Sequence, residues 1–160
     1  MDEMRLYTLD EAHGEFARKL NGEVWELLET TDRSSVDDER MLYAAWASAY
    51  HWLRVGTAVH HQRAEWLLSR VYAVLGDAPS AIAHARRCLE LTETSPGEME
   101  PFDLAYASEA IARASALAGD EHESTRYLKL AREAGTRIIN AEDRQIFEGD
   151  LNGGNWYGIA

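Results

Sequence analysis

The feature that most constrains the fold is a paired apolar pattern on either side of the dipeptide Gly76-Asp77. Before this break, apolar side chains recur at the spacing of one helix face from Leu68 to Leu75. After it, a matching stripe of smaller side chains runs from Ala81 to Leu89. Glycine can close a helix in the left-handed conformation, and aspartate can cap the helix that follows. Because the break is so short, the sequence predicts two antiparallel helices that form a hairpin.

The stretch 64–91 resembles the tetratricopeptide repeat, a helix–turn–helix unit of about 34 residues. Three positions depart from the family pattern. Glu65 stands at its early tryptophan position, Ala85 stands at a large aromatic position, and the closing proline is out of register, with Pro96 nearby. The resemblance implies a right-handed stack of hairpins with a groove for a peptide or protein, lined by the first helix of each hairpin. The pattern positions that the sequence does fill are Leu68, Ser69, Tyr72, Gly76, Ala81 and Cys88.

A second break of the same kind, Gly119-Asp120, lies 43 residues beyond the first. Ser115 replaces the aromatic residue of the repeat, so this copy follows the pattern less closely. A looser echo lies upstream, where Trp46, Trp52 and Gly56 have the spacing of Trp66, Tyr72 and Gly76. When the glycines of the two breaks are aligned, the pattern positions Leu68, Ser69, Ala81 and Cys88 correspond to Ile111, Ala112, Ser124 and Ala131.

These echoes predict one all-α domain over residues 1–160, built as a tetratricopeptide-like α-solenoid of about six or seven helices. Residues 1–56 form the N-terminal helices, 57–138 the repeat core, and 139–160 a capping helix and a tail. We expect Leu68, Tyr72 and Leu89 to be buried between helices, and Trp46 to point inward.

Composition limits the classes of function that the chain can serve. An apolar content of 46% over 160 residues suits a single domain with a sizeable core. The net charge of −12 argues against nucleic acid and anionic membranes as partners, because both require a basic surface. Cys88 is the only cysteine, which excludes an internal disulfide. The sequence suggests neither a signal peptide nor a membrane span, so we expect a cytoplasmic protein.

The family resemblance also implies which residues line the binding groove. Arg70 and Arg113 fall at equivalent positions, and two guanidinium groups can clamp a carboxylate, so an acidic or C-terminal carboxylate ligand is expected. Replacing both arginines is then expected to weaken binding and to change the melting temperature little. The alternative is that they form surface ion pairs with Glu65 or Glu109. The groove residues implied in this way are Arg63, Trp66, Arg70, Tyr106, Glu109 and Arg113.

The histidines offer an alternative site. If a hairpin turns at Gly56, His51 and His61 face each other, and Glu65 lies one helical turn beyond His61. Two histidines and one glutamate from paired helices are a set that can bind a metal. The sequence contains no HExxH motif, however, and the primary prediction has no metal and no cofactor.

We therefore predict a non-enzymatic scaffold that binds a protein or peptide. One alternative is a helical protein with a metal or small-molecule site near His51 and His61. Another alternative is an oligomerising or regulatory domain, and a homodimer is one form that such a domain could take. The tail carries Trp156, Tyr157 and Ile159, and such apolar side chains favour contact over solvent exposure. We expect the tail to fold back over residues 121–149, or to insert into a second copy.

Overall fold

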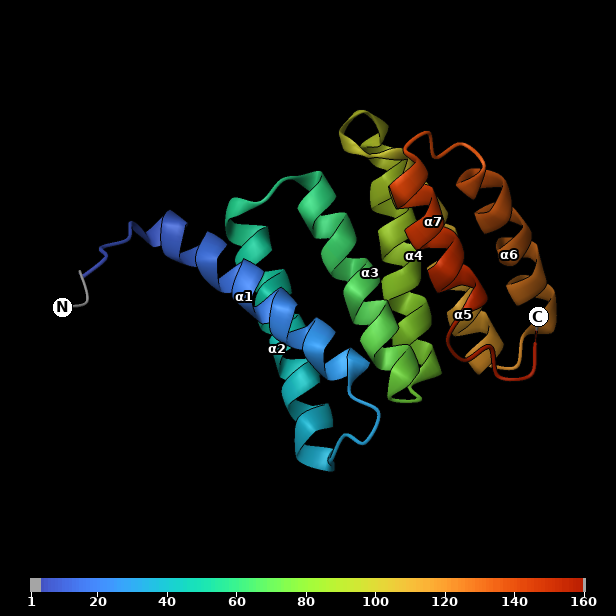
Figure 1. Ribbon diagram of the computed structural model, residues 1–160, viewed down its shortest axis with the longest axis horizontal. Coiled ribbons are helices and arrows are strands. Elements are labelled where there is room, and N and C mark those ends of the chain that lie inside the picture. Colours follow the sequence, from blue (N-terminus) through green and yellow to red (C-terminus); the bar gives the residue numbers. More distant parts are fainter. Residues whose placement is uncertain (1–3, 160) are drawn as a thin grey trace.

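The computed structural model describes residues 4–159, and these form seven α-helices and no strand (Figure 1). The prediction of an all-α chain is confirmed for this part of the sequence. Residues 1–3 and 160, which the predicted domain includes, lie outside the described residues. A short 3-10 helix, Pro96–Glu98, joins the fourth and fifth α-helices. The α-helices are α1 (Leu9–Glu29), α2 (Ser35–Val55), α3 (Ala58–Val74), α4 (Ala78–Thr94), α5 (Pro101–Leu117), α6 (Glu121–Gly135) and α7 (Ala141–Asn152).

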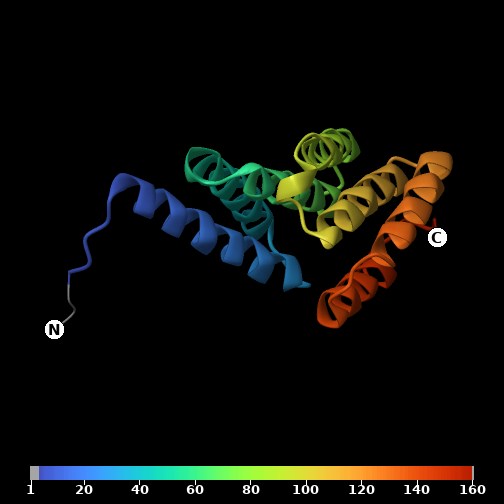
Figure 2. The same cartoon turned by 90° about the horizontal axis from the view of Figure 1, so that it is seen from above.

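Consecutive helices pack as hairpins. The most extensive contacts join α1 to α2, α3 to α4, and α5 to α6, while α2–α3 and α4–α5 contacts join one hairpin to the next. The last helix, α7, packs mainly on α5. Figure 2 shows that α1 and α7 flank the same side of the molecule, with α3 and α5 between them and α4 on the far side. This side is therefore concave, and the candidate site described below lies on it.

The two Gly-Asp breaks have the same local structure. Gly76 has φ +83 and Gly119 has φ +78, which are left-handed values that only glycine adopts freely. The amide of each following aspartate donates to a carbonyl five residues earlier, from Asp77 to Tyr72 and from Asp120 to Ser115. This is the Schellman arrangement that closes a helix. Both aspartate side chains then accept from the first turn of the next helix, so the same dipeptide closes one helix and caps another.

The positions that define the repeat pattern are buried in both hairpins. Each of them is exposed by 2% or less, which is consistent with the alignment of the two breaks. Small side chains dominate the set, and they let paired helices approach closely. The set consists of Leu68, Ser69, Ala81 and Cys88 in the first hairpin, and Ile111, Ala112, Ser124 and Ala131 in the second.

Three predictions of burial are wrong. Tyr72 and Leu89 are only half-buried, whereas Leu68 is buried as predicted. Trp46, predicted to point inward, is exposed on α2. Its indole nitrogen donates to the Tyr72 hydroxyl at 2.9 Å, so the two aromatic rings cover the α2–α3 contact from outside instead of filling it. Apolar periodicity does not distinguish these two arrangements, because a large aromatic side chain can reach its neighbour from the edge of a helix face.

Helix α5 lies at the centre of the fold. It contacts α3, α4, α6 and α7, and most of its side chains from Ala105 to Ala116 are buried. Six of these residues are alanines, and their small side chains allow four helices to pack around α5. Three buried members of α5 are charged, namely Asp103, Glu109 and Arg113, and they organise the site described next. Within residues 4–159, no helix has the length and apolar character needed to cross a membrane.

Candidate ligand-binding groove

An open cleft of about 320 Å³ lies on the concave side of the molecule. It receives side chains from α1, α3, α5 and α7, which are the helices that Figure 2 shows on that side. Six of the lining residues are aromatic or aliphatic, which suits an apolar ligand group. The cleft is lined by Asn21, Trp25, Gln62, Arg63, Trp66, Leu67, Phe102, Asp103, Tyr106, Ile146 and Asp150.

Aromatic rings form the walls of the cleft. Trp25 of α1 stacks on Trp66 of α3, with 5.7 Å between ring centroids and 22° between planes. Tyr106 of α5 meets the Trp66 ring edge to face at 5.4 Å. At the rim, Trp25 and Ile146 of α7 are exposed to solvent. The walls thus come from four helices that are far apart in the sequence, and two of the groove residues predicted from the repeat, Trp66 and Tyr106, lie side by side here.

The charged groups of the cleft are engaged with neighbouring side chains. Arg63 binds the buried Asp103 carboxylate through two hydrogen bonds, Nε to Oδ1 at 2.9 Å and Nη2 to Oδ2 at 3.1 Å. The same guanidinium lies over the Phe102 ring. The Tyr106 hydroxyl donates to Asp150 at 2.5 Å, and burial, followed by this bond, raises the pKa of Tyr106 well above its usual value. These pairs hold the aromatic walls in place.

Gln62 contributes a buried polar group to the cleft wall. Its Nε2 donates to the Thr92 hydroxyl and to the Asp103 carbonyl. The Thr92 hydroxyl already donates to the Cys88 carbonyl, so both partners of Nε2 are acceptors and the amide orientation is fixed. Gln62 Oε1 is therefore an acceptor, and it receives no hydrogen bond from any residue between 4 and 159.

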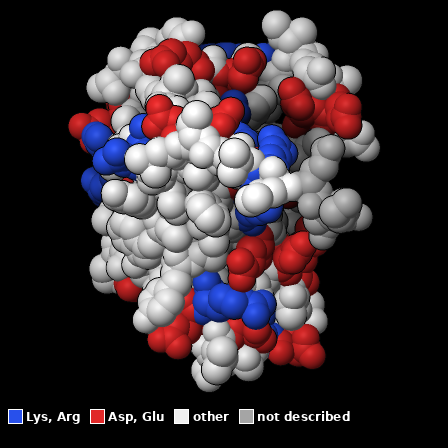
Figure 3. Space-filling view, turned by 90° about the vertical axis from the view of Figure 1, so that its left-hand side faces the viewer, with Lys and Arg blue, Asp and Glu red and all other residues white. Residues whose placement is uncertain are grey.

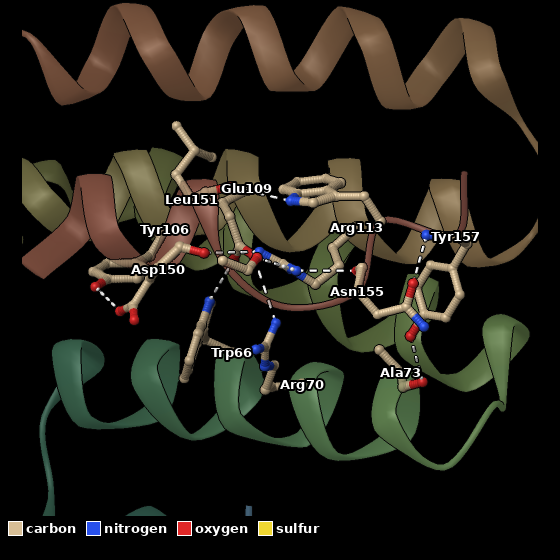
Figure 4. A network of polar contacts seen from close by, with 12 residues as sticks. Trp66, Arg70, Ala73, Tyr106, Glu109, Arg113, Asp150, Leu151, Asn155 and Tyr157 are labelled. Carbon is tan, nitrogen blue, oxygen red and sulfur yellow. Dashed lines mark hydrogen bonds and ion pairs between the residues drawn. The ribbon is translucent and has the colours of Figure 1, made fainter. Parts of the chain in front are cut away.

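Beside the cleft, Glu109 and Arg113 of α5 form a buried ion pair, with their side chains exposed by 3% and 4%. Glu109 also accepts from the Trp66 indole nitrogen at 3.3 Å. Figure 4 shows how this carboxylate stands between α3 and the Arg113 guanidinium. The alternative prediction that the arginines form surface ion pairs names the correct partner, because Arg113 does pair with Glu109. It is wrong about the location, because this pair is buried.

Arg113 also binds the main chain of the C-terminal segment, which we define as residues 153–159. Its Nη1 donates to the carbonyls of Gly153 and Asn155, both at 3.1 Å, and its Nη2 donates to the carbonyl of Asp150 at 3.0 Å. Its guanidinium also lies 4.1 Å from the centroid of the Trp156 ring. A ligand carboxylate can thus reach Arg113 only after this segment has moved. Because Arg113 is buried and paired, we now expect its replacement to destabilise the protein, in contrast to the expectation drawn from the repeat pattern.

Arg70 differs from Arg113 in its surroundings. Its closest ion-pair contact is to Glu109 at 3.9 Å, which is too long for a strong hydrogen bond. The side chain is 26% exposed, and burial lowers the pKa of its guanidinium. An anion beside it would offset this loss of hydration. Among the arginines predicted to line the groove, Arg70 therefore keeps the most capacity for a ligand.

The alternative metal set does not assemble. His51 contacts His13 instead, with 2.8 Å between their Nδ1 atoms, and burial lowers the pKa of His51. His61 lies 3.5 Å from Glu65, and Glu65 in turn binds His84 of α4. Across residues 4–159, no group of three or more His, Cys, Asp or Glu side chains is arranged to hold a metal ion. The prediction placed His51 opposite His61, but α2 directs it toward α1.

Several residues of the site were not predicted. Trp25 and Ile146 come from helices outside the repeat resemblance, and the family pattern gives no signal for them. Asp103 and Asp150 pair with predicted residues, but their partners lie 40 or more positions away in the sequence. The aromatic tail was the one usable signal, since Trp156 and Tyr157 indicated a contact. No protein-family model, no curated protein and no solved structure matches this chain.

Proposed function

We propose that this chain is a non-enzymatic binding module that holds a peptide or a segment of a partner protein on its concave side. The open aromatic cleft between α1, α3, α5 and α7 is the observation that carries the proposal. The repeated Gly-Asp hairpins support a tetratricopeptide-like, right-handed stack, in which first helices line the ligand groove. The acidic and basic side chains of the cleft are paired with each other, and this pairing supports a fixed surface for binding. We place this activity in the cytoplasm.

The charge of the groove indicates what the partner carries. Arg70 is half-buried with a single long ion-pair contact, and Arg63 is partly exposed at the rim. An acidic side chain or a C-terminal carboxylate of the partner would find a cation at either place. Beside them, the cleft accepts an aromatic or aliphatic side chain between Trp25, Trp66 and Ile146. The proposed ligand therefore combines one apolar anchor with one carboxylate.

A peptide library tests this function. We expect peptides selected against the immobilised chain to bind Ile146→Asp at least about tenfold more weakly, because a carboxylate at the cleft rim removes apolar contact and repels the ligand's acid. The matched control is Ile139→Asp, since Ile139 is an exposed isoleucine outside the cleft lining, and it should bind these peptides unchanged. Fluorescence polarisation of labelled peptides measures the affinity of each variant. Failure to enrich any peptide, or equal binding to both variants, would refute the proposal.

A second candidate function is self-association through the outer face of α2. Tyr43, Trp46, Tyr50 and Leu53 recur at helical spacing and are exposed. No Asp, Glu, Lys or Arg occurs between positions 41 and 53. Figure 3 looks onto this end of the molecule and shows a broad surface without charge. An exposed apolar patch of this kind usually marks an interface, and two copies of an uncharged stripe avoid the repulsion that a net charge of −12 creates elsewhere.

The mass of the protein in solution tests this second candidate. We expect the unmodified chain to have the mass of two copies by light scattering, and Leu53→Arg to have the mass of one, because a guanidinium within the apolar contact cannot be hydrated. Leu130→Arg is the matched control, since Leu130 is exposed on α6, and it should remain a dimer. A single-copy mass for the unmodified chain at about 100 µM would rule out a dimer with the micromolar affinity that this patch would support.

A further inference from the structure

The C-terminal segment lies beside the open cleft, against the groove residues Arg70 and Arg113, and is held there by contacts with other parts of the chain. It contains no α-helix, and its one backbone hydrogen bond in a turn runs from the Ile159 amide to the Trp156 carbonyl. Trp156 packs against the cluster formed by α5, α6 and α7, as the sequence led us to expect. Tyr157 reaches farther than expected, since its hydroxyl donates to the Ala73 carbonyl of α3 at 3.0 Å. The segment therefore bridges two helices of the concave side (Figure 4).

These contacts are of the kind that hold a bound peptide. Arg113 binds the carbonyls of Gly153 and Asn155, which any peptide main chain offers. The indole of Trp156 lies against the same guanidinium, and the phenol of Tyr157 finds a carbonyl at the end of α3. The hydrogen bonds to the main chain supply affinity, and the two aromatic side chains supply selectivity. The contacts made by this segment thus indicate which chemical groups the groove binds, namely peptide carbonyls and aromatic side chains.

The backbone of the segment is shaped to fit the groove. Gly154 has φ +73 and Tyr157 has φ +55, and a left-handed tyrosine is uncommon and unfavourable. Gly154 is also pressed against the groove, because a Cβ atom there would lie 2.7 Å from Arg113 Nη1 and 3.2 Å from Arg70 Nη2. The strain at Tyr157 lowers the free energy needed to release the segment from the groove, so the segment is poised to be displaced.

We propose that the C-terminal segment is an internal ligand of the groove, and that a partner protein displaces it with a peptide carrying adjacent tryptophan and tyrosine residues. Displacement uncovers Arg113 beside Arg70, which restores the pair of arginines at equivalent repeat positions. This inference rests on the proposed function and names the class of partner. The partner's main chain binds Arg113, its tryptophan covers the guanidinium, and its tyrosine bonds to the Ala73 carbonyl.

A glycine pair in the segment allows a matched test. Gly154→Ala introduces a methyl group against Arg113 and loosens the internal ligand, whereas Gly158→Ala has the same left-handed strain at φ +80 with nothing within 4 Å. The probe is a fluorescein-labelled synthetic peptide with the sequence of residues 149–160, GDLNGGNWYGIA. We expect it to bind Gly154→Ala at least about tenfold more tightly than the unmodified chain or Gly158→Ala, because competition from the internal ligand falls. A peptide with alanine in place of its tryptophan should not bind.

Equal affinity of the probe for all three proteins would overturn the inference, as would equal binding of the alanine-substituted peptide. A doubled mass of Gly154→Ala relative to the unmodified chain would also overturn it, because the segment of a second copy would then be the occupant. Circular dichroism checks that the helices persist. If the helices of Gly154→Ala do not persist, Tyr157→Phe replaces it as the test variant, because it loses only the hydrogen bond to the Ala73 carbonyl. We then expect the probe to bind this variant about threefold more tightly than the unmodified chain. If library peptides still bind in an Ile146-dependent way while this probe fails, the inference alone is refuted; if both fail, so is the proposed function.

Discussion

Replacing Arg113 by alanine is expected to destabilise the protein by about 3–5 kcal/mol. The change leaves the Glu109 carboxylate buried without its cation and removes three hydrogen bonds to main-chain carbonyls of residues 150–155. A charge without a partner in the protein interior is costly, because neither water nor an opposite charge compensates it. For a chain of this size the melting temperature should fall by about 6 to 20 °C. Thermal unfolding followed by circular dichroism measures the shift.

An exposed ion pair provides the control. Arg126 and Glu123 on α6 are joined at 3.5 Å with the arginine side chain largely in solvent. Arg126→Ala should therefore change stability by no more than about 0.5 kcal/mol. The double variant Glu109→Leu with Arg113→Met should be more stable than Arg113→Ala alone, since no uncompensated charge remains. Equal melting temperatures for Arg113→Ala and Arg126→Ala would contradict the buried pair.

Replacing Phe147 by alanine should cost about 3–5 kcal/mol in unfolding free energy. Phe147 is exposed by only 1% and is the largest fully buried side chain of the protein among residues 4–159. Its ring packs edge to face on Tyr106 at 5.0 Å and lies against Gly135 at the end of α6. The substitution leaves a cavity between α5, α6 and α7 that these helices cannot easily close. Urea denaturation should show a lower midpoint at an unchanged slope.

Phe16 of α1 is the matched control for this substitution. It is exposed by 54%, so Phe16→Ala removes a phenyl ring without opening a cavity. We expect a loss of about 1 kcal/mol or less, most of it from the ring stacked on His51. If both variants unfold at the same urea concentration, α7 is not anchored by Phe147 in the way that the structure describes.

Local signals in the sequence were sufficient to predict the helices. The Gly-Asp breaks at positions 76 and 119 each combine a left-handed glycine with a capping side chain, and both effects act within a few residues. Thr8 and Ser34 form capping boxes that begin α1 and α2, and these too depend only on the next turn. For this reason the helix ends at the two Gly-Asp breaks could be predicted, and so could the burial of Leu68.

The candidate site depends on interactions that no local pattern contains. The repeat correctly gave Arg70 and Arg113 equivalent positions in their helices, but their surroundings differ, because Arg113, and not Arg70, donates hydrogen bonds to main-chain carbonyls of residues 150–155. Whether an arginine binds a ligand or its own chain depends on which distant segment arrives beside it. The same holds for His51, whose partner is His13 of α1 and not a residue of α3. Such pairings follow from tertiary packing, and helical periodicity in the sequence carries no information about them.

The most direct test of the account is a crystal structure of the chain bound to a library-selected peptide. We expect an apolar side chain of the peptide to lie in the cleft between Trp25, Trp66 and Ile146, with a carboxylate of the peptide within about 3 Å of the Arg70 guanidinium. A peptide bound to the outer faces of α2, α4 or α6, with the cleft left open, would contradict it.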